Sequence, residues 1–135
     1  MRSAWGRRCE DRVASEQVAK PACKPGDTEF TGTAAETTAT VRLRLELTKG
    51  KRSPWLRIEK PDSLVAVHAN RPLEVAVETA TFLLMDWLIT EYGLSATDAY
   101  CLISTCPDFR INVYQMCKIG KLSFVAGAEL PKRYL

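Results

Sequence analysis

The sequence predicts an α+β fold in which two helices pack on one face of a small antiparallel sheet. Three features indicate this class. Apolar residues alternate with polar ones in the segment 38–59, which is typical of strands that are wet on one face. From residue 73 the apolar spacing changes to three and four residues, the period of an amphipathic helix. A last apolar run near the C-terminus predicts a return to the sheet, so that strands and helices form two layers.

Three strands are predicted before the helices. In residues 38–47, TATVRLRLEL, apolar side chains alternate with charged ones, and a turn signal at 49–51 separates them from a second alternating segment at 55–59. These two segments are expected to pair antiparallel across the turn. Residues 63–69, SLVAVHA, follow a break at Pro61 and form the third strand.

Two helices follow the strands. A long amphipathic helix is predicted from Leu73 to Tyr92, and Gly93 stops it because glycine readily takes the left-handed conformation of a helix C-terminus. A second helix begins after Ser95, which resembles a capping box with Asp98 three residues later. This helix is expected to continue to about Cys106, before a proline.

The ends of the chain differ in their patterns. A last strand is predicted around residues 122–130. In residues 1–25 charges interrupt every apolar group without a helical or strand period, so this segment is predicted to be a loosely ordered tail. Residues 26–135 are predicted to form one domain, because 135 residues are too few for two ordinary ones.

Charge and cysteine content exclude several classes. The net charge is only +3 and the basic residues are spread along the chain, so no nucleic-acid partner is expected. No apolar run approaches the ~18 residues of a membrane-spanning helix, so no membrane association is expected. The five cysteines form no Cys-x-x-Cys pair, which favours free thiols in a cytoplasmic setting. Cys101 and Cys106 are expected to pack on the second helix rather than act as nucleophiles.

The stretch KPGDTEFTG, residues 24–32, contains a candidate site. Asp27 and Glu29 lie two residues apart on a segment expected to be extended, so their carboxylates point to the same side and could share a cation or a water molecule. The alternative is a polar turn that leads into a strand, because aspartate after glycine is common in turns.

Four short motifs occur along the chain in one order. They are GDTE at 26–29, GLSATDAYCLIS at 93–104, PDFRI at 107–111 and LPK at 130–132. In this order they resemble the GDGE, GLS-x-x-x-AY-x-L-x-S, GDLRI and LPK motifs in the C-terminal part of the acetamidase/formamidase family. The resemblance covers residues 26–135.

The resemblance implies a hydrolase that acts on carbon–nitrogen bonds, other than peptide bonds, in short linear amides. The implied substrate is a small amide, the implied catalytic residues are Asp27, Glu29 and Asp108, and the implied ligands of a divalent metal ion are Asp27 and Glu29. Asp108 could instead bond backbone amides in a local turn. Arg110 could hold a carboxylate by a bidentate contact, or be a plain surface arginine.

The chain also departs from the family pattern. Family members are more than twice as long, and a histidine that they place ahead of GDGE is replaced here by Ala22. The single histidine, His68, lies on a predicted strand, where a structural role is expected. Two hypotheses follow: an amidase whose site is completed by an upstream polypeptide or by a homo-oligomer, and a truncated, non-catalytic remnant that keeps the fold and the interaction surface.

Overall fold

A computed structural model describes residues 30–31, 38, 40, 42–47, 49–50, 53–118 and 120–135 of the chain. These residues fall into two structural units: residues 38, 40 and 42–47 belong to one, and the other described residues to the second. The predicted tail, residues 1–25, lies outside the described residues. The domain boundary at residue 26 therefore stays a prediction.

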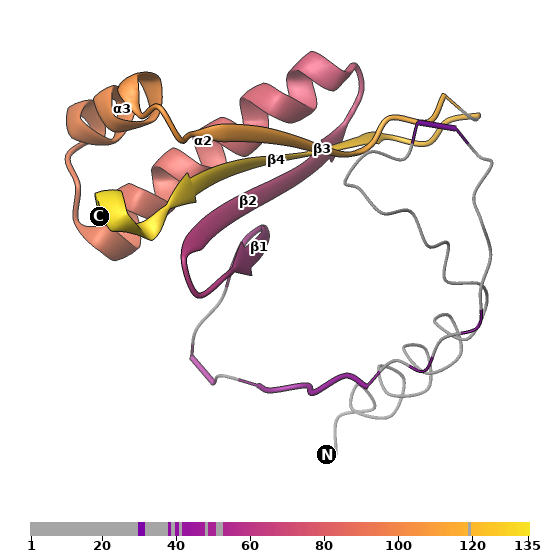
Figure 1. Ribbon diagram of the computed structural model, residues 1–135, viewed down its shortest axis with the longest axis horizontal. Helices are drawn as coiled ribbons and strands as arrows, with labels where there is room; N and C mark the ends of the chain where they lie inside the picture. Colours follow the sequence, from indigo (N-terminus) through magenta and orange to yellow (C-terminus); the bar gives the residue numbers. More distant parts are fainter. Residues whose placement is uncertain are drawn as a thin grey trace. The chain divides into compact units, whose positions relative to one another are not determined.

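The second unit is built on a four-stranded antiparallel sheet in the order β1-β2-β4-β3 (Figure 1). The strands are β1 (Leu56–Glu59), β2 (Ser63–Asn70), β3 (Arg110–Gln115) and β4 (Phe124–Pro131). The two central strands, β2 and β4, pair along their whole length, from Ser63 opposite Pro131 to Asn70 opposite Phe124. The outer strands β1 and β3 each attach to one of these central strands.

The predicted strands at 55–59, 63–69 and 122–130 are confirmed to within a few residues. The predicted strand at 38–47 is wrong for residues 42–47, which have no regular secondary structure, and β1 pairs with β2 instead. The side chains that would form its apolar face, Leu43, Leu45 and Leu47, are 51%, 68% and 86% exposed. An alternating pattern becomes a stable strand only where a neighbouring strand and a core receive it.

Strand β3 was not predicted. Its sequence, RINVYQ, is short and has no Gly or Pro boundary of its own apart from the preceding Pro107. It also contains a register shift between Val113 and Gln115, which breaks the simple alternation that identifies a strand in sequence.

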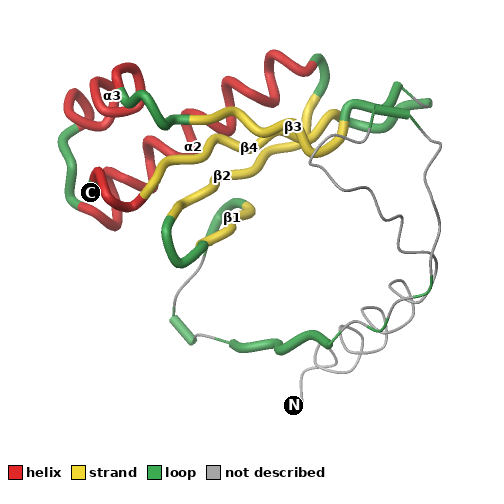
Figure 2. The backbone as a smooth tube through the Cα atoms, in the orientation of Figure 1, coloured by secondary structure: helices red, strands yellow, loops and turns green. Residues whose placement is uncertain are grey.

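Both predicted helices are confirmed (Figure 2). Helix α2 (Leu73–Tyr92) ends at Gly93, which has φ of 72°, the left-handed conformation that favours glycine. Helix α3 (Ala96–Thr105) begins after Ser95, whose Oγ accepts a hydrogen bond from the Asp98 backbone N–H at 3.1 Å. A short 3-10 helix, η1 (Lys132–Tyr134), follows β4.

The hydrophobic core lies between α2 and one face of β2 and β4 (Figure 1). Leu64 and Leu130 from the strands and Leu84 and Leu88 from the helix are fully buried there. Helix α3 packs on α2 through the buried side chains of Ala99 and Ile103, among others. Both helices therefore belong to the layer on one face of the sheet, which confirms the predicted fold class.

The two cysteines of the α3 region differ. Cys106 is partly buried and packs against the core, as predicted. The prediction for Cys101 is wrong, because its side chain is exposed. It lies between buried Ala99 and Ile103 in sequence, and the helical period carries it to the outer side of α3.

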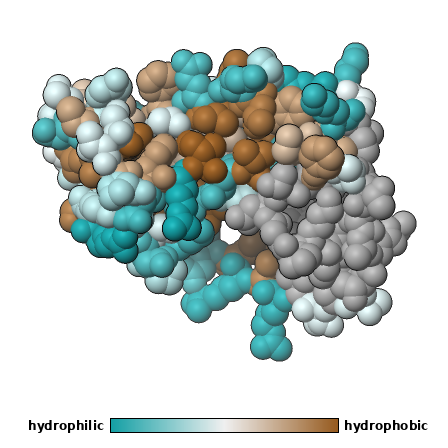
Figure 3. Space-filling view, turned by 45° about the horizontal axis from the view of Figure 1, so that its top comes forward, coloured by the Kyte–Doolittle hydropathy of each residue, from teal (hydrophilic) through white to brown (hydrophobic). Residues whose placement is uncertain are grey.

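Helix α2 is apolar on more than its core face. Phe82 lies on its outer side and is 59% exposed, and Figure 3 shows apolar surface in the upper part of the view, among hydrophilic side chains.

None of the helices in the described part of the chain combines the length and the apolar character needed to cross a bilayer.

The opposite face of the sheet is closely packed around Gly127 on β4. A Cβ atom at this position would lie 2.6 Å from the Tyr114 ring and 2.9 Å from the Val65 side chain. Glycine is required because the Tyr114 ring of the neighbouring strand lies directly over its backbone. This face, which no described helix covers, carries the polar groups analysed below.

Trp87 on α2 is 2% exposed and belongs to the hydrophobic core, so its removal is predicted to reduce stability. Replacing Trp87 by Ala should lower the free energy of unfolding by about 3–5 kcal/mol, because a large aromatic side chain is removed and a cavity remains. Denaturant melts of both proteins measure the difference. The control is Phe82→Ala on the exposed side of the same helix, which should change stability by less than about 0.5 kcal/mol. Equal effects of the two substitutions would contradict the assigned core.

Candidate functional site

A pocket of about 570 Å³ lies where β2 begins and β4 ends. We call it the Asp108–Glu129 pocket. It is lined by Pro61, Asp62, Ser63, Asp108, Arg110, Glu129, Pro131, Lys132 and Arg133. Three acidic and three basic residues thus line one pocket, contributed by β3, β4, the segments that precede β2 and β3, and η1.

Glu129 is the most enclosed acidic group of the pocket, with a side chain only 15% exposed. Its Oε1 accepts hydrogen bonds from Ser63 Oγ at 2.6 Å and from Lys60 Nζ at 2.8 Å. Its Oε2 accepts one from Asn112 Nδ2 at 2.6 Å. Two of these three donors lie on the strands beside β4 and the third just before β2, so the carboxylate ties the sheet together.

The strand register explains this arrangement. Glu129 lies opposite Val65 on β2 and opposite Arg110 on β3. Ser63 and Asn112 are two residues away from these positions, and side chains two apart on a strand share a face. Glu129 therefore lies between the Ser63 hydroxyl on β2 and the Asn112 amide on β3. All three side chains are on the sheet face opposite to α2.

The protonation state of Glu129 follows from these contacts. Burial raises the pKa of a carboxyl group, but the hydrogen bonds from Lys60, Ser63 and Asn112 all stabilise the anion. The net result is a pKa below the ordinary value, so Glu129 stays ionised at neutral pH.

Asp108 lies at the same pocket, after the end of α3. Its Oδ2 accepts hydrogen bonds from the Tyr134 hydroxyl and from Arg133 Nη2. These contacts, with the Tyr134 hydrogen bond as the main cause, lower the pKa of Asp108. From the sequence, Asp108 could also have bonded backbone amides in a local turn. In the structure its side chain instead bonds Arg133 and Tyr134 of η1, near the C-terminus.

Arg110 is the third charged group of interest. It lines the pocket opposite Glu129 and its charge also helps to lower the pKa of Asp108. Among the described residues its guanidinium has no hydrogen bond or ion pair. It therefore keeps five N–H donors free for a ligand, in the fork geometry that suits carboxylates and carbonyl groups.

The predicted site residues are brought together only in part. Asp27 and Glu29 lie outside the described residues, so their role stays a prediction. Asp108 lies at the pocket. His68 is half-buried on β2 and shares the face of Leu64 and Ala66, away from Glu129, which agrees with a structural role.

The described residues do not form a metal centre. Within them, no group of three histidine, cysteine, aspartate or glutamate side chains is arranged to hold a metal ion. Glu129 accepts hydrogen bonds from lysine, serine and asparagine side chains, and Asp108 accepts them from arginine and tyrosine side chains. The predicted divalent metal ion, assigned to Asp27 and Glu29 outside the described residues, stays a prediction.

The sequence interpretation missed Glu129 and its partners Lys60, Ser63 and Asn112. One signal was available: Glu129 is the only charged residue in the strand sequence FVAGAELP. A lone charge in an otherwise apolar strand indicates either an exposed edge or a buried polar contact. The partners could not be found in the same way, because they lie 17 to 69 residues away in sequence.

Part of this chain is similar in structure to two solved acetamidases. No family model matches the sequence, and no curated protein does. Among solved structures, an acetamidase from Yersinia enterocolitica has a TM-score of 0.55 and 28% identity, over 64% of this chain and 24% of that chain. An acetamidase from Bacillus halodurans has a TM-score of 0.50 and 19% identity, over 60% of this chain and 26% of that chain. This chain therefore matches about a quarter of each acetamidase.

The Glu129 contacts predict a pH-dependent contribution to stability. At neutral pH, Glu129→Gln should lower the free energy of unfolding by about 1–3 kcal/mol, because the charge-assisted hydrogen bonds are weakened. The folded pKa lies below the ordinary value of 4.5, so this difference should persist above pH 4.5 and disappear as the pH falls through the folded pKa.

Urea unfolding at several pH values measures this difference. The control is Glu59→Gln, which removes a more exposed carboxylate paired with Lys132 at 2.9 Å and should cost less than about 0.5–1 kcal/mol. A Glu129→Gln difference that is the same at pH 7 and at pH 3 would show that Glu129 is not stabilised as an anion.

Proposed function

From the similarity to part of two acetamidases, we propose that this chain contributes the Asp108–Glu129 pocket to a hydrolase of short linear amides. The reaction adds water to R–CO–NH₂ and yields a carboxylate and ammonium. The observation that supports the proposal most directly is the charge arrangement of the pocket: two ionised carboxylates lie beside the Arg110 guanidinium, which has no hydrogen bond or ion pair to any described residue.

This arrangement matches the hydrogen-bonding groups of a primary amide. Such an amide has two N–H donors and one carbonyl acceptor on a planar frame. Carboxylate oxygens of Asp108 or Glu129 accept from the N–H₂ group, and Arg110 donates to the carbonyl oxygen. When water attacks the carbonyl carbon, negative charge develops on that oxygen, and a guanidinium already directed at it stabilises the transition state more than the ground state.

The pocket does not supply every step. Amide hydrolysis also needs a base to activate water and an acid to protonate the departing nitrogen. The pKa values of Asp108 and Glu129 are both lowered, so these groups are weak bases and do not donate protons at neutral pH. In this proposal they bind and orient the amide, and proton transfer is carried by other groups.

The other groups are proposed to lie elsewhere in a larger assembly. The chain spans about a quarter of the length of the acetamidases that it resembles. Asp27 and Glu29 are candidates for positioning a metal ion or water, and a further polypeptide would provide the rest.

The test is ammonia release from formamide and acetamide. The purified chain alone should release no ammonia above background, because proton-transfer groups are missing from the pocket. The chain should become active when it is co-expressed with the part of the Yersinia enterocolitica acetamidase that it does not match. Arg110→Ala should then lower kcat by about a hundredfold, as loss of an oxyanion donor does.

Asp108→Asn and Glu129→Gln should lower activity as well, while Asp86→Asn serves as control. Asp86 is an exposed carboxylate on α2, on the other side of the sheet from the pocket. Circular dichroism establishes that each variant is folded. Absence of ammonia release in every combination would favour the non-catalytic alternative, and full activity of the Arg110 and Asp108 variants would show that the chemistry lies outside this pocket.

A further inference from the structure

Two of the charged residues that line the Asp108–Glu129 pocket, Asp62 and Arg110, are not used by its internal contacts. The other charged residues of the lining each have a partner of opposite charge. They form the pairs Arg133–Asp108, Lys132–Glu59 and Lys60–Glu129. Within the described part of the chain, the side chains of Asp62 and Arg110 have no hydrogen bond or ion pair. One anion and one cation therefore remain available to a ligand.

Asp62 is held at the pocket by its backbone. It lies in the segment between β1 and β2, and its carbonyl oxygen accepts a hydrogen bond from the Lys132 backbone N–H at 2.8 Å. This bond fastens the segment to the start of η1, beside the end of β4. The residue itself is exposed, so its carboxylate is accessible to a molecule that enters the pocket from solvent.

Asp62 and Arg110 lie on opposite sides of β4. Asp62 directly precedes β2 and Arg110 begins β3, and these two strands pair with opposite edges of β4. Neighbouring strands are about 4.8 Å apart, so the backbones of β2 and β3 are separated by about 10 Å. Glu129 lies between them on β4. A ligand that contacts both unpaired groups must therefore be elongated, with a polar group at each end.

The size of the pocket agrees with an elongated ligand. Its volume is about 570 Å³. Pockets that enclose larger organic molecules have volumes of about 300–1,000 Å³, far more than formamide or acetamide needs. Either of these small amides could contact Arg110 but would not extend across β4 to Asp62.

The chemistry of Asp62 indicates the second end of the ligand. An ionised carboxylate only accepts hydrogen bonds, and its strongest partner is a charged donor such as an ammonium group. The pocket's other cations do not take this place, because Lys132 and Arg133 are each paired with a different carboxylate.

We propose that Asp62 is a specificity-determining residue, which binds the ammonium group of an elongated amide of the type H₃N⁺–(CH₂)n–CO–NH₂. This rests on the proposed function for the amide end of the ligand, which Arg110 contacts through the carbonyl oxygen. The substrate class is thereby narrowed to linear amides whose far end is a cation. Asp62 positions this end and takes no part in bond making.

The test compares two probes of nearly equal size by titration calorimetry with the purified full chain. γ-Aminobutyramide ends in an ammonium group, and valeramide has a methyl group at the same position. At low salt γ-aminobutyramide should bind about tenfold more tightly, the effect of one hydrogen bond between charged groups. This preference should decrease at about 1 M salt, because screening weakens an accessible ion pair.

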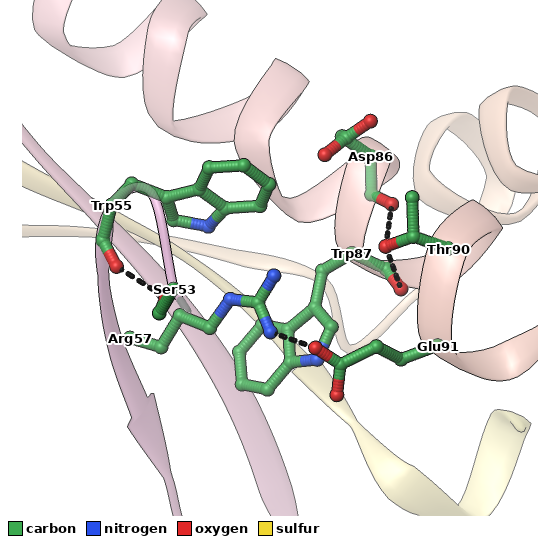
Figure 4. Close-up of polar contacts among 7 residues, drawn as sticks. All are labelled: Ser53, Trp55, Arg57, Asp86, Trp87, Thr90 and Glu91. Carbon is green, nitrogen blue, oxygen red and sulfur yellow. Dashed lines mark hydrogen bonds and ion pairs between the residues drawn. The ribbon is translucent and has the colours of Figure 1, made fainter. Parts of the chain in front are cut away.

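Asp62→Asn keeps the size of the side chain and removes its charge. This variant should lose the preference for γ-aminobutyramide while its affinity for valeramide and its thermal stability stay unchanged. The matched control is Asp86→Asn, the same chemical change at an exposed position on α2 (Figure 4), which should keep the preference.

Three results would each overturn the proposal. They are no measurable binding of γ-aminobutyramide, equal affinity for the two probes, and a preference that survives Asp62→Asn. Tighter binding of glutaramate, which has a carboxylate at the far end, would also overturn it and would assign that end to a basic residue.

Ammonia release separates this inference from the proposed function. Asp62-dependent binding of γ-aminobutyramide without ammonia release in any co-expressed combination would support the role of Asp62 and reject the hydrolase. Ammonia release from acetamide with no preference for γ-aminobutyramide would support the hydrolase and reject the role of Asp62.

Discussion

The pairing of β2 with β4 is the constraint on which the rest of the structure depends. The two strands pair over eight residues, and their side chains alternate between the two faces of the sheet. On one face, Leu64 and Leu130 are buried against α2, and on the other, Glu129 reaches Ser63 and Asn112. A shift of one residue in this register would exchange the two faces, placing leucine at the pocket and glutamate in the core. The hydrophobic core therefore also determines the position of the polar site.

The pocket is suited to binding more than to proton transfer. Donors around Asp108 and Glu129 hold both groups in the ionised form, and Arg110 has no hydrogen bond or ion pair within the part of the chain that the structure describes. Such fixed charges need no reorganisation when a polar substrate arrives, which is the main requirement for electrostatic stabilisation. In the proposed function this arrangement would orient the amide, and the acid and base would come from other groups.

Strand β1 joins the helix layer to the wall of the Asp108–Glu129 pocket. Arg57 on this strand stacks between Trp55 and Trp87 (Figure 4), and Glu59, two residues later, contacts Lys132 at 2.9 Å. Lys132 lines the pocket and begins η1, whose Arg133 and Tyr134 hold Asp108. Side chains of β1 therefore contact both α2 and the pocket wall.

Local sequence patterns determined the two helices almost to the residue, because their signals are contained within a few turns. Gly93 provides the left-handed stop and Ser95 the cap, and neither depends on distant residues. The alternating segment at 42–47 had an equally regular pattern but no strand, because a strand requires partners that a pattern does not specify. The candidate site was identified only through Asp108 and Arg110, within one short motif. Tertiary structure decided the rest, since Glu129 meets Lys60 and Ser63 only after strands far apart in the sequence are brought into register.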